Sequence, residues 1–238
     1  MFQRTQPDGH DPLMRVSEFE RDHAAPSGAG DAEAGATRLS ALNPSLLQDL
    51  MRFEQRHRPG EGLDLLEVLA AALRHHRALL LHLQLSQRVI ALTVLPASRQ
   101  LHSPLTPPQW LALRLPDLRV LRVEPARASA PGSAAPALQA LAPLLWDMAL
   151  RGARADLLPE IAGIATSRVG PGSDLHKLNL GGTLAAAVAR LRVQTTPLHE
   201  IASWPGFERD RAMRLLNALY LQSALIVSRS HPAAVSGL

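Results

Sequence analysis

The spacing of apolar residues changes once in the first half of the chain, and this change constrains the fold more than any other feature. From residue 44 to residue 74 the apolar residues recur every three or four positions, which is typical of amphipathic helices. From residue 79 to residue 95 they recur at every second position on both sides of Ser86-Gln87, which is typical of two strands joined by a tight turn. The pattern predicts an α+β fold, a small antiparallel sheet carrying helices.

Composition divides the chain into four parts. Residues 1–42 combine proline, glycine and scattered charges without apolar periodicity, so we predict a disordered tail. Residues 43–127 hold the α+β module. The run 128–136 is rich in Ala, Ser, Pro and Gly and predicts a linker that lets its two neighbours move. Residues 137–238 are expected to form a mainly helical domain.

Within that domain, residues 181–229 predict three helices followed by a strand. The second helix is short, Pro205-Gly206 forms a tight turn after it, and the third helix covers 207–224. The apolar run at 225–228 can extend as a wing-like strand. This order is the outline of a helix-turn-helix, so we expect the chain to end in a winged-helix-like trihelical unit.

The third helix of this unit offers two alternative functions. Its candidate DNA or partner contacts are Arg209, Arg211, Arg214 and Asn217. Three arginines and two acids, Glu208 and Asp210, give the polar face a charge of only +1. Because affinity for DNA depends on neutralising phosphates, each acid on this face weakens the DNA alternative. The segment therefore favours a packing or protein-interaction unit, and a DNA-binding transcriptional regulator is the alternative.

Part of the chain resembles the PATAN-type domains of bacterial signalling proteins. The residues that carry the resemblance are Leu198-His199-Glu200-Ile201-Ala202, Ala212-Met213-Arg214-Leu215-Leu216-Asn217-Ala218-Leu219 and Leu225-Ile226-Val227, preceded by a helix and a small β-meander. The resemblance covers 60–103 and 180–228. The family usually has a glycine between the helix and its first strand, where this chain has His75-His76-Arg77-Ala78. It implies a non-enzymatic role in two-component, motility or surface-behaviour signalling.

The residue types that carry catalysis do not form a recognisable motif. The chain has no cysteine, which excludes disulfides, thiolate metal sites and a cysteine nucleophile. His75 and His76 lack further ligands nearby in sequence, and their place at a helix end is typical of dipole complementation. His199-Glu200 lacks the second histidine of a zincin motif, because Ser203 stands there. We therefore expect no enzyme activity, no cofactor and no metal ion.

The remaining features predict the setting of the protein. Trp110 follows Pro107-Pro108 in a predicted loop and is a candidate anchor for a protein partner. No run approaches the roughly 18 to 20 uninterrupted apolar residues that span a bilayer. The absence of cysteine and of a continuous apolar stretch in 1–42 predicts a cytoplasmic protein. Lys177 is the only lysine, which is typical of a GC-rich bacterial genome. Together these features predict a bacterial regulatory or signalling adaptor.

Overall fold

The structure is a computed structural model, and it describes residues 13–24, 44–56, 63–126, 138–178 and 180–229. Within these ranges the chain is an α+β protein with an antiparallel sheet and helices, as the change of apolar spacing predicts. No helix in the described ranges has the length and apolar character needed to span a bilayer. The predicted linker at 128–136 lies outside the described residues.

The larger sheet carries the predicted hairpin at its centre. Its strands are β1 (Met14–Arg15), β2 (Leu79–Leu85), β3 (Arg88–Leu95), β4 (Gln100–His102), β5 (Arg119–Pro125) and β6 (Gln139–Ala140). They run antiparallel in the order β5-β2-β3-β4-β6, and β1 pairs with the first two residues of β3. Leu79, Leu81 and Leu83 are buried on one face, while the side chains between them are half-buried on the other. The period of two therefore sets which leucines enter the core.

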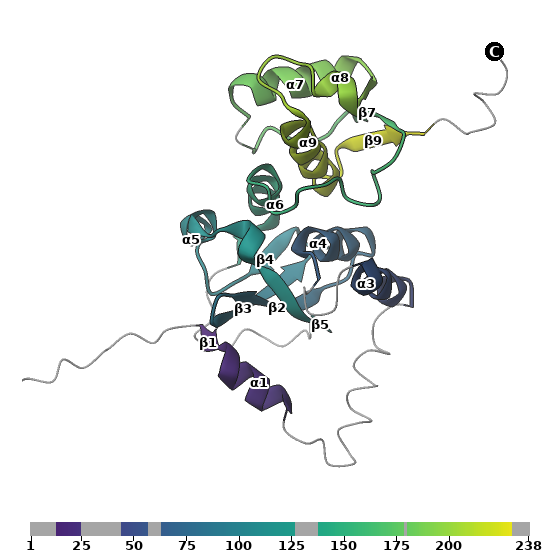
Figure 1. Cartoon of the computed structure of the whole chain (residues 1–238). Helices are drawn as coiled ribbons and strands as arrows, with labels where there is room; N and C mark the ends of the chain where they lie inside the picture. The colour runs from purple at the N-terminus through teal and green to yellow at the C-terminus, as the bar shows by residue number, and fades with distance from the viewer. Residues whose placement is uncertain (1–12, 25–43, 57–62, 127–137, 179, 230–238) are drawn as a thin grey trace, which may run out of the picture.

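Helices cover both faces of this sheet unequally. The helices of this part are α1 (Val16–Ala24), α3 (Pro44–Arg56), α4 (Leu65–Arg74), α5 (Pro107–Ala112) and α6 (Leu141–Leu150), with a short 3-10 helix at Leu115–Asp117. Figure 1 shows α4 and α6 between the larger sheet and the second half of the chain, and α1 on the opposite side of the sheet. Asp64 caps α4 by accepting hydrogen bonds from the backbone N–H groups of Leu66 and Glu67.

The second half contains three helices and a small sheet. The helices are α7 (Gly182–Val193), α8 (Leu198–Ile201) and α9 (Arg209–Leu221), and the strands are β7 (Thr166–Val169), β8 (Thr196–Pro197) and β9 (Leu225–Ser228). The strands are antiparallel in the order β8-β7-β9. The three helices and β9 lie where the sequence predicts them, whereas β7 and β8 were not expected. The likeness of this unit to a winged helix stays a prediction.

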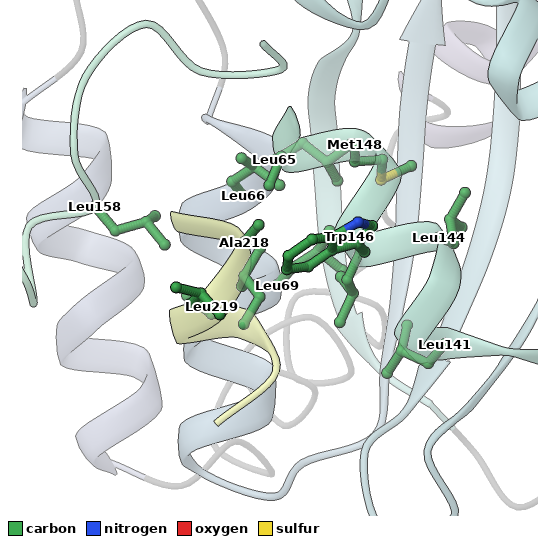
Figure 2. Packing of buried hydrophobic residues seen from close by; sticks show 14 of the residues in the cluster. Leu65, Leu66, Leu69, Leu141, Leu144, Trp146, Met148, Leu158, Ala218 and Leu219 are labelled. Atoms are coloured by element: carbon green, nitrogen blue, oxygen red, sulfur yellow. The ribbon is translucent and has the colours of Figure 1, made fainter. Parts of the chain in front are cut away.

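One apolar core joins the two halves. The buried cluster extends from Leu46 in α3 to Ala224 before β9. Figure 2 shows the Trp146 ring of α6 close to Leu69 of α4 and Ala218 of α9. All three side chains are buried. Helix α4 is buried almost all round because it lies between the sheet and α9, so its sequence is nearly uniformly apolar.

The prediction of a disordered tail over the whole of 1–42 is wrong for residues 13–24. These residues form β1 and α1, and Phe19 is buried with its ring 5.0 Å from the His82 ring on β2. A strand of two residues is stable only through its pairing with β3, so no local period reveals it. The rest of the predicted tail lies outside the described residues.

Candidate functional site

Arg209 and Arg211 lie at the start of α9 in different settings. Arg209 is exposed at the first helical position. The Arg211 guanidinium donates to the Gly206 carbonyl at 2.6 Å and to Thr183 Oγ1 at 2.8 Å. It also lies over the Phe207 ring, with 5.1 Å between its Cζ and the ring centroid. Arg211 therefore ties the turn before α9 to the start of α7.

The other two predicted contacts of α9 face the interior of the fold. Arg214 is half-buried, and its Cζ lies only 2.8 Å from the place that a Cβ on Gly152 would take. Asn217 is 1% exposed. Its amide accepts a hydrogen bond from the Leu158 N–H at 2.9 Å and donates one to the Asp156 carbonyl at 2.9 Å. The prediction that Asn217 contacts DNA or a partner is therefore wrong, because the polar face of α9 is exposed only over its first turn and is buried at Asn217.

The prediction of Trp110 as an exposed anchor is also wrong. Trp110 is 1% exposed, and its indole Nε1–H donates to Ser103 Oγ at 3.1 Å. The Pro107-Pro108 pair does not form a loop but begins α5, since proline at the first helical positions costs no hydrogen bond. Thr106 and Gln109 form a capping box around this start, with the Thr106 N–H donating to Gln109 Oε1 at 2.8 Å.

The structure also contains a cleft that the sequence did not reveal. It has a volume of about 380 Å³ and lies between α3, the end of α4 and the turn at 158–161. Its walls are formed mainly by charged side chains, together with one aromatic ring: Asp49, Arg52, Phe53, Gln55, Arg56, Arg74, Pro159 and Glu160. We call this feature the α3 cleft.

Arg74 connects the three walls of the α3 cleft. Its guanidinium donates to Asp49 Oδ2 of α3 at 2.8 Å, and it pairs with Glu160 Oε1 of the turn at 3.0 Å. His75 Nε2 lies 2.7 Å from the same Asp49 oxygen. Both acids are largely buried, and both have a cation at hydrogen-bond distance. Because each bond joins different segments, the network fixes the shape of the cleft.

A second group of charges lies behind the cleft. The Glu67 side chain is 2% exposed, and its Oε1 is 2.9 Å from Arg154 Nη1. The same nitrogen is 2.9 Å from Asp64 Oδ2 at the cap of α4. Arg56 Nη2 lies 3.6 Å from Glu67 Oε2. A buried carboxylate is tolerated only when cations neutralise it, so Arg154 stabilises α4 against the second half of the chain.

The outermost charges of the cleft belong to α3. The side chains of Arg52 and Arg56 are 61% and 43% exposed, and they lie one helical turn apart. Arg52 Nη1 is 4.0 Å from Asp49 Oδ1, and the Arg56 Cζ lies 5.0 Å from the centroid of the buried Phe53 ring. The exposed side of the cleft is therefore positive, while its carboxylates lie deeper.

Tyr220 of α9 reports on the charges around the cleft. Burial is the main cause that raises the pKa of its phenol above 10.0; Glu160 and Asp49 raise it further, and Arg74 lowers it. Tyr220 is the only tyrosine, so the absorbance of tyrosinate measures it directly. We expect a titration midpoint above 10.0, a lower midpoint in Glu160→Gln and a higher one in Arg74→Gln.

The same titration predicts how stability changes at high pH. Because folding raises the pKa of Tyr220, the contribution of the neutral phenol to stability is complete below the unfolded pKa of about 10 and is lost as the pH rises through the folded pKa.

The matched control for the titration of Tyr220 is Glu54→Gln, on the exposed side of α3, which should leave the titration midpoint unchanged. If the midpoint of the Tyr220 titration is the same in Glu160→Gln as in the wild type, this arrangement of charges is contradicted.

Comparisons with known proteins identify no relative. No family model matches the chain, and no curated protein or solved structure matches it. The resemblance to PATAN-type domains stays a prediction. Among the described residues, no three His, Asp or Glu side chains are grouped so that they could hold a metal ion.

Proposed function

We propose that the chain is a non-enzymatic regulatory or signalling adaptor that acts through contacts with another protein. The observation that supports this proposal is the α3 cleft. Its base is formed by charge pairs between three segments, and Arg52 and Arg56, whose side chains are 61% and 43% exposed, stand at its opening. Arginine is enriched among the residues that dominate protein–protein binding energy. The proposed setting is the cytoplasm of a bacterium, as the composition predicts.

The alternative, a DNA-binding transcriptional regulator, has less support on α9. A recognition helix needs free polar side chains at base edges. Asn217 is buried, Arg211 binds the Gly206 carbonyl and Thr183, and Arg214 packs against Gly152. Arg209 and Arg211 are the exposed members of the four predicted contacts, and Arg211 already donates two hydrogen bonds within the fold. The alternative therefore depends mainly on Arg209 and on the charges of neighbouring elements.

Capture of a partner tests the adaptor. The immobilised chain is incubated with nuclease-treated lysate of cells that encode it, and retained proteins are identified by mass spectrometry. Each candidate is then purified, and its binding to the chain is measured by calorimetry. We expect a purified protein to bind with a defined stoichiometry. A protein that is retained only from lysate without nuclease treatment contradicts the proposal. So does a candidate that no longer binds the chain once it is purified.

Titration with DNA tests the alternative. We expect no change in the fluorescence anisotropy of a labelled random duplex at low salt. Binding that weakens steeply as salt is raised would favour the regulator instead. In that case, Arg209→Gln should reduce the affinity, and Arg21→Gln on α1, also exposed, is the control with the same charge change. Loss of DNA binding only in Arg209→Gln would overturn the adaptor proposal.

A further inference from the structure

The α3 cleft has a charge distribution that suits an anionic ligand. Its carboxylates, Asp49 and Glu160, are largely buried and are held by Arg74. The more exposed charges are the guanidinium groups of Arg52 and Arg56. A ligand at the opening therefore meets cations first, whereas the acids are already paired beneath them. Charges of this kind steer partners of opposite sign.

The guanidinium groups of Arg52 and Arg56 have N–H donors that are available to a ligand. Neither guanidinium donates a hydrogen bond to a residue that the structure describes, and the closest carboxylate oxygens lie at 4.0 Å and 3.6 Å. A guanidinium group has five N–H donors in a planar fork that matches a carboxylate. The two like charges also repel each other at a spacing of one turn. An anion that bridges or flanks them relieves this repulsion.

The spacing of the two arginines suits an extended peptide. Four residues of helix rise about 6 Å along the axis. In an extended chain, alternate residues are about 6.6 Å apart and point to the same side. Carboxylates at alternate positions of an extended segment therefore match the two guanidinium groups one to one. The cleft, with a volume of about 380 Å³, is large enough for several side chains of such a segment.

We infer that the α3 cleft binds an acidic segment of the partner protein, with carboxylates at alternate positions held by Arg52 and Arg56. The inference rests on the proposed function and names the chemistry of the partner. Phe53 supports Arg56 from below through its ring face, and the pairs of Arg74 hold the walls in place. The site is thus largely formed before the ligand arrives, which lowers the cost of binding.

The test uses the whole chain and a dye-labelled synthetic peptide in which glutamate alternates with serine. We expect the peptide to raise its anisotropy on binding, and the same peptide with glutamine in place of glutamate to stay free. Arg52→Gln with Arg56→Gln should weaken binding about tenfold or more. Arg168→Gln with Arg192→Gln removes two exposed arginines of β7 and α7 and should change the affinity less than about twofold.

A further variant separates loss of binding from loss of structure. Arg56 lies near the buried Glu67, so its replacement can destabilise the fold. Arg52→Gln changes a mostly exposed side chain and should weaken peptide binding while leaving the thermal unfolding midpoint unchanged. Equal weakening in the cleft pair and in the control pair overturns the inference. So does equal binding of the glutamine peptide, or a preference for the same peptide with phosphoserine in place of glutamate.

The effect of these variants on partner binding distinguishes failure of the inference from failure of the proposed function. If a purified partner binds wild-type chain and the Arg52→Gln, Arg56→Gln variant equally well, the inference fails and the adaptor proposal stands. If the cleft pair alone loses the partner, and the glutamate peptide competes with it, both are supported.

Discussion

Replacing Arg154 by methionine is expected to lower the free energy of unfolding by about 3–5 kcal/mol. Arg154 Nη1 lies 2.9 Å from Glu67 Oε1, and the Glu67 side chain is 2% exposed. Without the guanidinium, the buried carboxylate loses its contact of 2.9 Å, and the Arg56 guanidinium lies farther away, at 3.6 Å. Arg154 Nε also donates to the carbonyls of Asp156 and Leu157, so the segment that leads to the cleft loses two bonds. Urea unfolding followed by tryptophan fluorescence measures the change.

A double variant identifies the cause of this loss. Glu67→Gln with Arg154→Met removes the buried charge together with its cation, so it should be less destabilised than Arg154→Met alone. Arg168→Met, an exposed arginine on β7, is the matched control and should change the free energy of unfolding by less than about 0.5 kcal/mol. A similar small loss in Arg154→Met would show that Glu67 does not depend on Arg154.

The elements predicted correctly are those that local spacing determines. The alternation of leucines in 79–85 and the Ser86-Gln87 turn define the β2–β3 hairpin without reference to any distant residue. Proline at the first helical position marks the start of α3 in the same way. Strands β1 and β6 have two residues each and pair with β3 and β4, so the rest of the sheet creates them. No period of so few residues can be detected.

The two wrong predictions of contact residues, Asn217 and Trp110, share one cause, which is burial on more than one side. A single apolar stripe on α9 predicts one buried face, but α9 contacts three other helices, α4, α6 and α8. Asn217 is therefore enclosed and pairs with the backbone at 156 and 158. Trp110 is enclosed in the same way, with Ser103 supplying its hydrogen-bond acceptor. Polar residues with internal partners look like surface residues in a sequence.

The α3 cleft was missed for a different reason. Asp49, Arg52 and Arg56 follow helical spacing on α3, and this pattern alone suggests a solvated helix face. What makes the pattern a site is Arg74 and Glu160, which belong to other segments and meet α3 only after folding. Charges that are distant in sequence pair without a periodic signal. The cleft can therefore be recognised only in the folded structure.

Replacing Asn217 by alanine tests the internal role of α9 and is expected to lower the free energy of unfolding by about 2–4 kcal/mol. The change removes two hydrogen bonds of 2.9 Å and leaves the Leu158 N–H without its acceptor inside the fold. An unsatisfied buried backbone donor costs about 1–3 kcal/mol, in addition to the net value of the bonds. Because Leu158 is completely buried, no water replaces the amide easily.

Two measurements distinguish this internal role from a contact on the surface. Hydrogen exchange at the Leu158 amide should become faster in Asn217→Ala, since the side-chain oxygen that accepts its hydrogen bond is gone. Gln48→Ala, on the exposed side of α3, removes a comparable side chain and should leave both stability and exchange unchanged. If Asn217→Ala behaves like Gln48→Ala, the Asn217 side chain does not hold the segment at 156–158.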